Sequence, residues 1–366
     1  MRDRDLSLKI QERKSETKQA VSVYQIDPLQ DSRWRHFSLE HPSASVFHTP
    51  AWLEALRRTY GYEPFVLTTC PPGQELTNGL VLCRINSRFT GRRLVSLPFS
   101  DHCEPLVDGP KDIEQLHCGL EGLVEEENLK YIEIRPAHAR LEGMPAFGKA
   151  KKFWSHRIDL RPSLDQLFHS FHRDCVQRKV RRAEREVLSH EEGRSESLLQ
   201  QFYYLLVLTR RRQQLPPHPL NWFRNLIGYL GDGIRIRVAS KNGQPVASIL
   251  TLRYKDALVY KYGCSDTRFS QYGGMPFLLW RAIQEAKENG LQEFDLGRSD
   301  CDNPGLVAFK DRWGSKRSSL TYWRCPPPNP EDLRPGWTAR AARQMVAHIP
   351  GSFLIMAGKL FYRHVG

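Results

Sequence analysis

The chain has 366 residues, of which 54 are Lys or Arg and 41 are Asp or Glu, and its formal net charge is +13. This length predicts about two domains. The basic excess favours acidic partners such as nucleic acid, phosphorylated cofactors or anionic lipid, although an Arg-rich soluble surface would give the same charge. No run of 18 apolar residues occurs, which argues against a membrane-spanning helix.

The eight cysteines and the N-terminus indicate the compartment. The cysteines show no C-x-x-C spacing and no nearby His in a zinc pattern, so we expect free thiols in a reducing cytosol and no metal site. Residues 1–20 are polar and lack the apolar core of a signal peptide. We therefore expect a flexible N-terminus at 1–20 and a cytoplasmic protein.

From residue 21 the chain follows a simple order of predicted elements. A short amphipathic helix at 51–60 comes first, and periodicity then predicts strands at 64–69, 79–85 and 94–99. A helix at 113–127 follows, and strands at 131–135 and 154–160 complete a first domain that spans 21–161. The joint to the next domain is expected near Arg161-Pro162-Ser163.

The same order recurs in a second domain, 162–325. Helical segments at 164–187, 198–213 and 222–230 precede strands at 234–239, 246–253 and 257–264. A helix at 275–289 and strands at 292–297 and 318–324 follow. The repeated order predicts an α+β protein with two similar domains, each a mixed, largely antiparallel sheet flanked by helices.

The carboxyl end, 326–366, departs from the repeat. A Pro-rich linker at 326–330 is followed by predicted helices at 337–348 and 352–364. The second of these helices mixes apolar residues with Lys359, Arg363 and His364. It either docks on the body of the protein, which we slightly favour, or lies on an anionic membrane surface.

The most informative stretch runs from Met275 to Gly314. Its helix is followed by a strand that ends in Gly297 and Arg298, and we expect a loop at 305–314. This loop carries cationic and aromatic side chains, which suits it to hold an anionic group: Phe309, Lys310, Arg312 and Trp313.

With these motifs the chain resembles the FemAB-like (BioF2-like) acyltransferases of the GNAT superfamily. The likeness is best over 164–324 and depends on the basic helix 178–185, Tyr262-Gly263, Trp280, the strand 294–299, Phe309-Lys310 and Trp313-Gly314. It implies two tandem GNAT-like domains and transfer of an acyl or aminoacyl group to an amine, often on a cell-envelope precursor. It also implies a functionally important lysine at the Phe-Lys pair.

Acyl transfer to an amine needs a proton acceptor and a group that stabilises the oxyanion. Lys310 is our candidate for the stabilising cation, although a lysine on a loop is more often a solvated charge. Asp295 is a candidate base, or could orient Arg298, and an ion pair with an arginine is the plainer interpretation. Tyr262 could donate to the leaving group, and core packing is its rival explanation.

Other residues are candidates for binding. Arg298 and Arg312 suit a phosphate because guanidinium groups bind it bidentately, and the aromatic rings of Phe309 and Trp313 would lower the local dielectric constant. The basic helix is either a solvated surface or a grip for a phosphorylated acceptor, through Arg178, Arg181 and Arg182. The loop at Asp101-His102 lies where it would line an acceptor cleft.

The acyl donor stays open between acyl-CoA and aminoacyl-tRNA. The amide groups of Gly273 and Gly274 begin a helix and could bind phosphate. However, residues 268–274 lack the glycine spacing of the GNAT pyrophosphate loop, and no long helical hairpin typical of peptidoglycan-bridge enzymes is present.

We therefore expect a cytoplasmic transferase, in the alternative case peripheral to the inner membrane, that modifies an amine of a cell-envelope, peptidoglycan or exopolysaccharide precursor. A small-molecule N-acetyltransferase that uses acyl-CoA is the alternative enzyme. A non-catalytic RNA-binding protein is the rival from another class, because of the net charge and the arginine clusters.

Overall fold

The computed structural model describes residues 22–138, 141–142, 144, 146–329 and 351–364. The N-terminal segment 1–20 and the helix expected at 337–348 lie outside these residues. Within the described part of the chain, no helix is both long and apolar enough to span a bilayer.

The described residues of the first half form three α-helices and six strands, close to the expected order. The helices are α1 (Ser32–Glu40), α2 (Pro50–Tyr60) and α3 (Pro110–Glu126). The strands are β1 (Tyr24–Ile26), β2 (Glu63–Thr68), β3 (Leu80–Ser87), β4 (Gly91–Ser96), β5 (Tyr131–Ile134) and β6 (Gly148–Asp159). Sequence patterns did not reveal β1 and α1, because β1 has only three residues and α1 has a weakly amphipathic sequence.

The second half repeats the pattern with longer strands. Its helices are α4 (Leu164–Ser170), α5 (Arg178–Arg185), α6 (Glu196–Arg212), α7 (Leu220–Leu230), α8 (Gly274–Glu288) and α9 (Pro304–Asp311), with a π-turn at 173–177. Its strands are β7 (Ser189–Gly193), β8 (Ile234–Lys241), β9 (Gln244–Tyr254), β10 (Ala257–Ser265), β11 (Glu293–Asp300) and β12 (Lys316–Cys325). The C-terminal helix α11 spans Gly351–Phe361.

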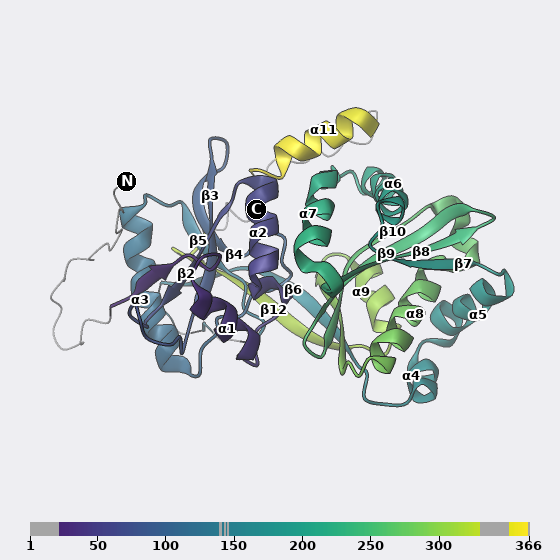
Figure 1. Cartoon of the computed structure of the whole chain (residues 1–366), viewed down its shortest axis with the longest axis horizontal. Coiled ribbons are helices and arrows are strands. Elements are labelled where there is room, and N and C mark those ends of the chain that lie inside the picture. Colours follow the sequence, from purple (N-terminus) through teal and green to yellow (C-terminus); the bar gives the residue numbers. More distant parts are fainter. Residues whose placement is uncertain (1–21, 139–140, 143, 145, 330–350, 365–366) are drawn as a thin grey trace.

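The strands of both halves join in one twelve-stranded sheet, and the last strand of each half pairs with the other half. The order is β1-β2-β3-β4-β5-β12-β6-β11-β10-β9-β8-β7. Strand β6 pairs antiparallel with β11, and β12 pairs antiparallel with β5. The long strands β6 and β12 also pair with each other and cross the middle of the molecule (Figure 1). The repeat thus gives two similar lobes joined by exchanged strands.

A shared core fixes the two lobes against each other. Helices α2 and α7 lie side by side at the junction (Figure 1), and the rings of Trp52 and Trp222 meet there at 5.2 Å between centroids. One apolar cluster contains buried residues of both halves, from Trp34 to Tyr362. The loops that end near this junction are therefore held in a fixed relation, which positions the charged groups described next.

Candidate active site

Lys310 is buried at the end of a helix and does not lie on an open loop. The loop expected at 305–314 is wrong, because Asn303 caps a helix and Pro304 occupies its first turn. Lys310 is 3% exposed, and its Nζ donates hydrogen bonds of 2.8 Å to the carbonyl oxygens of Gly297 and Arg298. Burial lowers the pKa of Lys310 to about 8, although the charges of Asp101 and Asp295 oppose this shift.

The carbonyl groups that Lys310 binds are presented by an irregularity in β11. Strands β10 and β11 run parallel and pair only at 257–259 with 293–295, although both continue beyond these residues. The pairing of β11 with β6 shifts register between Asp295 and Arg298. Gly297 lies in this bulge with φ +72°, and a Cβ there would be 3.1 Å from Oδ2 of Asp101. A glycine is needed at this place both for the backbone and for the approach of Asp101.

Asp101 comes from the first half and reaches the second. Its Oδ2 accepts a hydrogen bond of 3.1 Å from Nζ of Lys261 on β10, and Nε of Arg298 lies 3.7 Å from its Oδ1. The hydroxyl of Tyr322 on β12 donates to the backbone oxygen of Asp101 at 2.7 Å. Burial would raise the pKa of Asp101, but the charges of Lys261 and Arg298 outweigh it and hold the pKa below its usual range.

His102, the next residue, pairs with Asp295. Nε2 of His102 lies 3.4 Å from Oδ2 of Asp295, while the Gly297 amide donates to Oδ1 at 2.6 Å. Burial works to raise the pKa of Asp295, but the hydrogen bond and charge of His102 and the charge of Arg157 lower it to about 2. Nδ1 of His102 is buried and has no hydrogen-bond partner among the described residues. An oriented imidazole with a second nitrogen unused is the geometry of a proton acceptor.

These side chains form one assembly, the central ionic cluster, which consists of Asp101, His102, Lys261, Asp295, Arg298 and Lys310. It joins residues from the loop after β4, from β10, from β11 and from α9. Fixed charges in such a water-poor place interact more strongly than on the surface. The cluster can place a cation next to a developing negative charge, and a proton acceptor next to an amine.

The structure brings together three of the residues chosen from the sequence, Lys310, Asp295 and Arg298, and also the Asp101-His102 loop. Asp295 pairs with His102, where the sequence suggested Arg298 as the group it would orient. Lys261 was missed. A lysine in the middle of the apolar strand Leu258–Cys264 is the signal that would have pointed to it, since lysines are almost never buried without a partner.

The hydroxyl of Tyr262 points into the aromatic core between the halves and makes no hydrogen bond with the ionic cluster. Its hydroxyl accepts a hydrogen bond of 2.9 Å from Nε1 of Trp222, and the rings of Phe223 and His218 surround it. Burial raises its pKa well above the usual value. The adjacent Lys261 lies where the pairing of β10 with β9 shifts register, and its ammonium group joins the ionic cluster while also lying over the Tyr262 ring at 5.9 Å.

The aromatic residues near Lys310 face the core of the second half. Trp313 is fully buried against Phe171, with 5.0 Å between ring centroids, and Phe309 packs on the same core. They exclude water behind α9. Arg312 is exposed, and its carbonyl oxygen accepts a hydrogen bond from the His172 amide at 2.8 Å.

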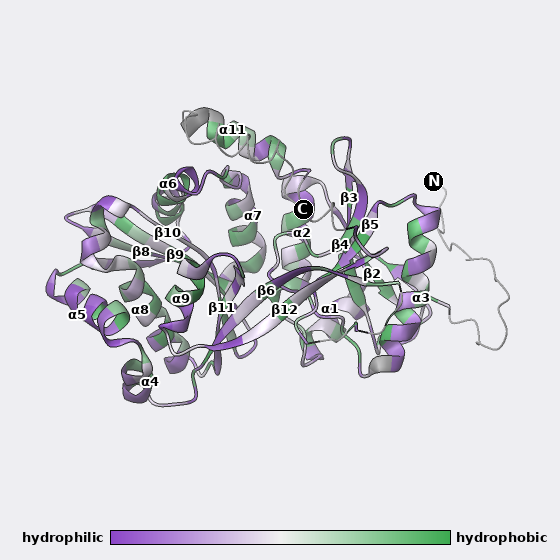
Figure 2. Ribbon diagram, turned by 180° about the vertical axis from the view of Figure 1, so that it is seen from behind, coloured by the Kyte–Doolittle hydropathy of each residue, from purple (hydrophilic) through white to green (hydrophobic). Residues whose placement is uncertain are grey.

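The basic helix α5 lies on the surface beside α8 and not at the cluster (Figure 1). Figure 2 shows it as mostly hydrophilic. Arg178 pairs with Asp174 at 3.0 Å, Arg181 lies over the ring of Phe168 and Arg182 approaches Glu186 at 3.7 Å; the side chains are exposed.

The first turn of α8, with Gly273 and Gly274, is covered by α5. Gly273 has φ +75°, and a Cβ there would clash with the carbonyl oxygen of Lys179, while a Cβ at Gly274 would be 3.0 Å from Cβ of Ala247. Both glycines are buried. A phosphate could reach these amide groups only if α5 moved.

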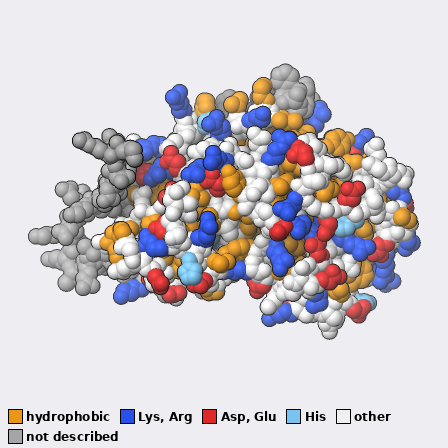
Figure 3. Space-filling view, in the orientation of Figure 1, with side chains coloured by type: hydrophobic (Ala, Val, Ile, Leu, Met, Phe, Trp, Pro, Cys, Tyr) orange, Lys and Arg blue, Asp and Glu red, His pale blue; other side chains and the backbone are white. Residues whose placement is uncertain are grey.

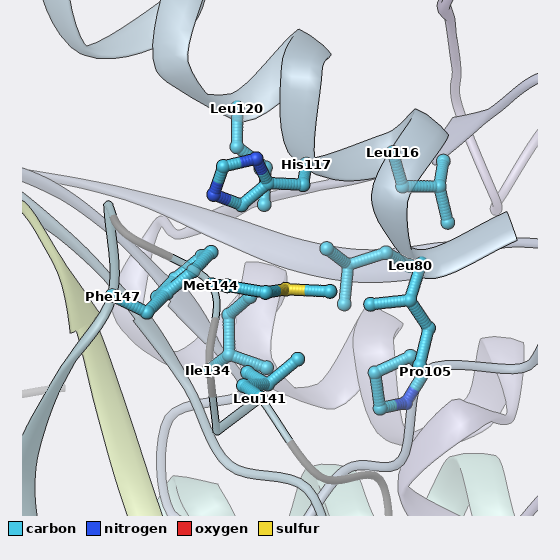
Figure 4. Close-up of a pocket in the computed structure, with 10 residues that line it drawn as sticks. Leu80, Pro105, Leu116, His117, Leu120, Ile134, Leu141, Met144 and Phe147 are labelled. Atoms are coloured by element: carbon cyan, nitrogen blue, oxygen red, sulfur yellow. The ribbon is translucent and has the colours of Figure 1, made fainter. Parts of the chain in front are cut away.

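Two cavities lie elsewhere. A small apolar one of about 10 Å³ lies in the first half, between α3 and the strands, and is lined by Leu80, Leu116 and Phe147 (Figure 4). This has room for about one water molecule. A polar one of about 90 Å³ lies at the carboxyl end of α8, and Arg237 and Glu285, which pair with each other, are among the residues that line it. Among the described residues, no group of three or more His, Cys, Asp or Glu side chains could hold a metal ion.

Comparison with known proteins agrees with this architecture. Residues 170–311 match the family model described as an acetyltransferase (GNAT) domain. The crystal structure of FemX is similar with a TM-score of 0.64 at 14% identity, and the match covers 79% of this chain and 95% of FemX. A comparison with curated protein sequences gave no significant match.

Further solved structures share the fold. The C-terminal domain of a putative lysylphosphatidylglycerol synthetase from Agrobacterium fabrum matches with a TM-score of 0.53 at 14% identity, over 87% of this chain and 94% of that one. A tandem GNAT protein from the clavulanic acid biosynthesis pathway matches with a TM-score of 0.52 at 10% identity, over 86% of this chain and 100% of that one. The prediction of two tandem GNAT-like domains is confirmed.

Proposed function

We propose that this chain is a FemAB-like acyltransferase of the GNAT superfamily, and that it transfers an acyl or aminoacyl group to an amine of a cell-envelope or exopolysaccharide precursor. The observation that carries the proposal is the buried ammonium group of Lys310. Two of its three donors bind the carbonyl groups of β11, and one N–H remains for a substrate oxygen.

The chemistry follows from the central ionic cluster. The acceptor amine attacks the acyl carbon, a C–N bond forms, and the C–S or C–O bond to the donor breaks after a tetrahedral intermediate. Lys310 stabilises the oxyanion of this intermediate through its remaining N–H. With a pKa of about 8, it is mostly protonated at pH 7.

The proton of the attacking amine passes to Nδ1 of His102. Asp295 is unsuited to be the base, because a carboxylate whose pKa is about 2 has too little affinity for a proton to take one from the attacking amine. We assign Asp295 the role of a positioning residue that holds Nε2 of His102. Arg298 lies across the ring of Phe153 at 4.3 Å and is about one-third exposed, which suits it to meet an anionic substrate at the entrance.

Two observations favour an aminoacyl ester over acyl-CoA as donor. The start of α8 is covered by α5, and residues 268–274 lack the spacing of a pyrophosphate loop. The tandem GNAT neighbour supports acyl-CoA instead, because it is described as a structure without AcCoA, which points to that ligand. Acyl-CoA is therefore included among the donors in the experiment below. The eight free thiols support a reducing, cytoplasmic location.

The rival function, RNA binding without catalysis, receives less support. Part of the positive charge is engaged within the protein, since Arg178 pairs with Asp174, Arg182 approaches Glu186 and Arg181 lies on Phe168.

The test is transfer by the purified full chain. Charged tRNAs and a panel of acyl-CoAs would be offered with amine-bearing envelope precursors, and the products would be measured by mass spectrometry. We expect product with one donor class and its loss, by about a hundredfold or more, in Lys310→Met. Lys316→Met is the matched control, since Lys316 is exposed at the start of β12. Equal turnover in both variants would contradict the proposal.

A further inference from the structure

The C-terminal helix α11 is fixed to both halves of the protein by one of its faces. Leu354 and Tyr362 are buried, and the ring of Tyr362 stacks on His218 at 3.9 Å between centroids. The Tyr362 hydroxyl donates to the Pro216 carbonyl at 2.9 Å, and a Cβ at Gly358 would clash with the Pro217 carbonyl oxygen. The helix thus docks on the body, one of the two arrangements that the sequence allowed.

The opposite face of α11 is apolar and exposed. Met356 is 54% exposed, Leu360 61% and Phe361 44%, and Phe89 at the tip of the β3–β4 hairpin is 83% exposed. These four residues, which we call the apolar ridge, are half of the eight large hydrophobic side chains that are exposed in the described part of the chain. Single exposed apolar residues need no explanation, but a group of them marks an interaction surface.

The hairpin and the helix form one continuous surface. The ring of Phe89 meets that of His364 at 5.0 Å between centroids, and Thr90 donates a hydrogen bond of 2.9 Å to the His364 carbonyl. Elements separated by more than two hundred residues in the sequence therefore present their apolar side chains together. Figure 3 shows hydrophobic and basic side chains along this upper edge of the molecule.

The charged residues on the two segments that carry the ridge are all basic. Arg88, Lys359 and Arg363 are exposed, and neither the hairpin segment 86–93 nor the segment 351–364 contains Asp or Glu. Apolar side chains ringed by Lys and Arg fit the interface of an anionic bilayer, where apolar groups enter the acyl boundary and cations meet the headgroups. A second copy of this chain would instead bring like charges together.

We propose that the apolar ridge and its cations bind the surface of an anionic membrane. The same helix thus docks on the protein with one face and on lipid with the other. This surface would bring the enzyme to an acceptor that is linked to lipid. That role of the surface, unlike membrane binding itself, rests on the proposed function. Vesicle binding itself requires no substrate, so its failure is distinguishable from a failure of transfer activity.

The experiment is co-sedimentation of the full chain with vesicles. Phosphatidylcholine vesicles would be compared with vesicles that also contain phosphatidylglycerol, at low and at high salt. We expect binding to the anionic vesicles, weakening with salt, and a loss of about tenfold or more in Phe89→Ser/Leu360→Ser and in Arg88→Glu/Lys359→Glu. Val187→Ser is the matched control, since Val187 is 82% exposed after α5 and away from the ridge.

Circular dichroism and thermal unfolding would show that each variant is folded. If the substitutions in α11 detach this helix from the body, Phe89→Ser alone still tests the ridge, because Phe89 lies at the tip of a hairpin. The proposal is overturned if both kinds of vesicle bind equally, if neither binds, or if the ridge variants bind like Val187→Ser. It is also overturned if light scattering shows a dimer that the ridge variants abolish, since the ridge would then be an interface between copies.

Discussion

Asp101 and Lys261 form an ion pair across the two halves of the protein, with 3.1 Å between Oδ2 and Nζ. Both side chains are largely buried, and the ammonium group also lies over the rings of Phe47 and Trp52. The pair links the loop after β4 to the strand β10 and carries the charge balance of the central ionic cluster. Removal of the pair should therefore lower the stability of the protein and also change the pKa of Lys310.

The first prediction concerns this pair. Asp101→Asn leaves Lys261 buried without a counter-charge and should lower the free energy of unfolding by about 3 kcal/mol. Lys261→Met in the same chain removes the orphaned cation and should restore most of the loss. Urea unfolding of the two single variants and the double variant measures the coupling. Additive effects would contradict a direct pair.

The second prediction concerns the pH dependence of transfer. Because Lys310 acts as a cation, turnover should decline as the pH rises through its pKa of about 8. The charge of Asp101 raises the pKa of Lys310, so Asp101→Asn should move the decline to lower pH. The measurement is kcat from pH 6 to 10 in the wild type and the variant. A decline that stays in place would show that another group causes it.

Much of this fold follows from the sequence, because hydrophobic periodicity and turn residues are local signals. The order of three strands, a helix and two strands in each half was predicted from such signals. The exchange of β6 and β12 was not, since the pairing of a strand with a distant partner depends on tertiary packing and leaves no local mark. The helix α9 did leave a mark, in Asn303 and Pro304.

The residues of the site could be predicted where they lie at sequence positions that often carry binding groups. Lys310, Asp295 and Arg298 stand at the end of a strand or in the motif that follows it, where binding groups are common. What brings Asp101, His102 and Lys261 to them is the contact between the two halves, and no pattern within either half specifies it. The burial of Gly273 under α5 likewise depends on how two helices pack.

The third prediction concerns Asp295. As the positioning residue for His102, it should affect the proton transfer, so Asp295→Asn should lower kcat by roughly a hundredfold and change KM little. Its pKa is lowered to about 2, so its contribution to stability is present above pH 4 and is lost as the pH falls toward 2. Acid unfolding of the wild type should therefore converge with that of Asp295→Asn in this range. A stability difference that persists at pH 2 would contradict the ionic pairing.

The fourth prediction separates backbone strain from the contact with Asp101. Gly297 and Gly290 have φ of +72° and +75°, but a Cβ at Gly290 would have no atom within 4 Å, whereas one at Gly297 would press on Asp101. Alanine at Gly290 should cost about 1 kcal/mol from the backbone alone and leave turnover unchanged. Alanine at Gly297 should cost more, and it should reduce turnover because the carbonyl groups of 297 and 298 hold Lys310. Chemical unfolding and kcat of the two variants test this, and equal effects in both would show that the bulge of β11 does not position Lys310.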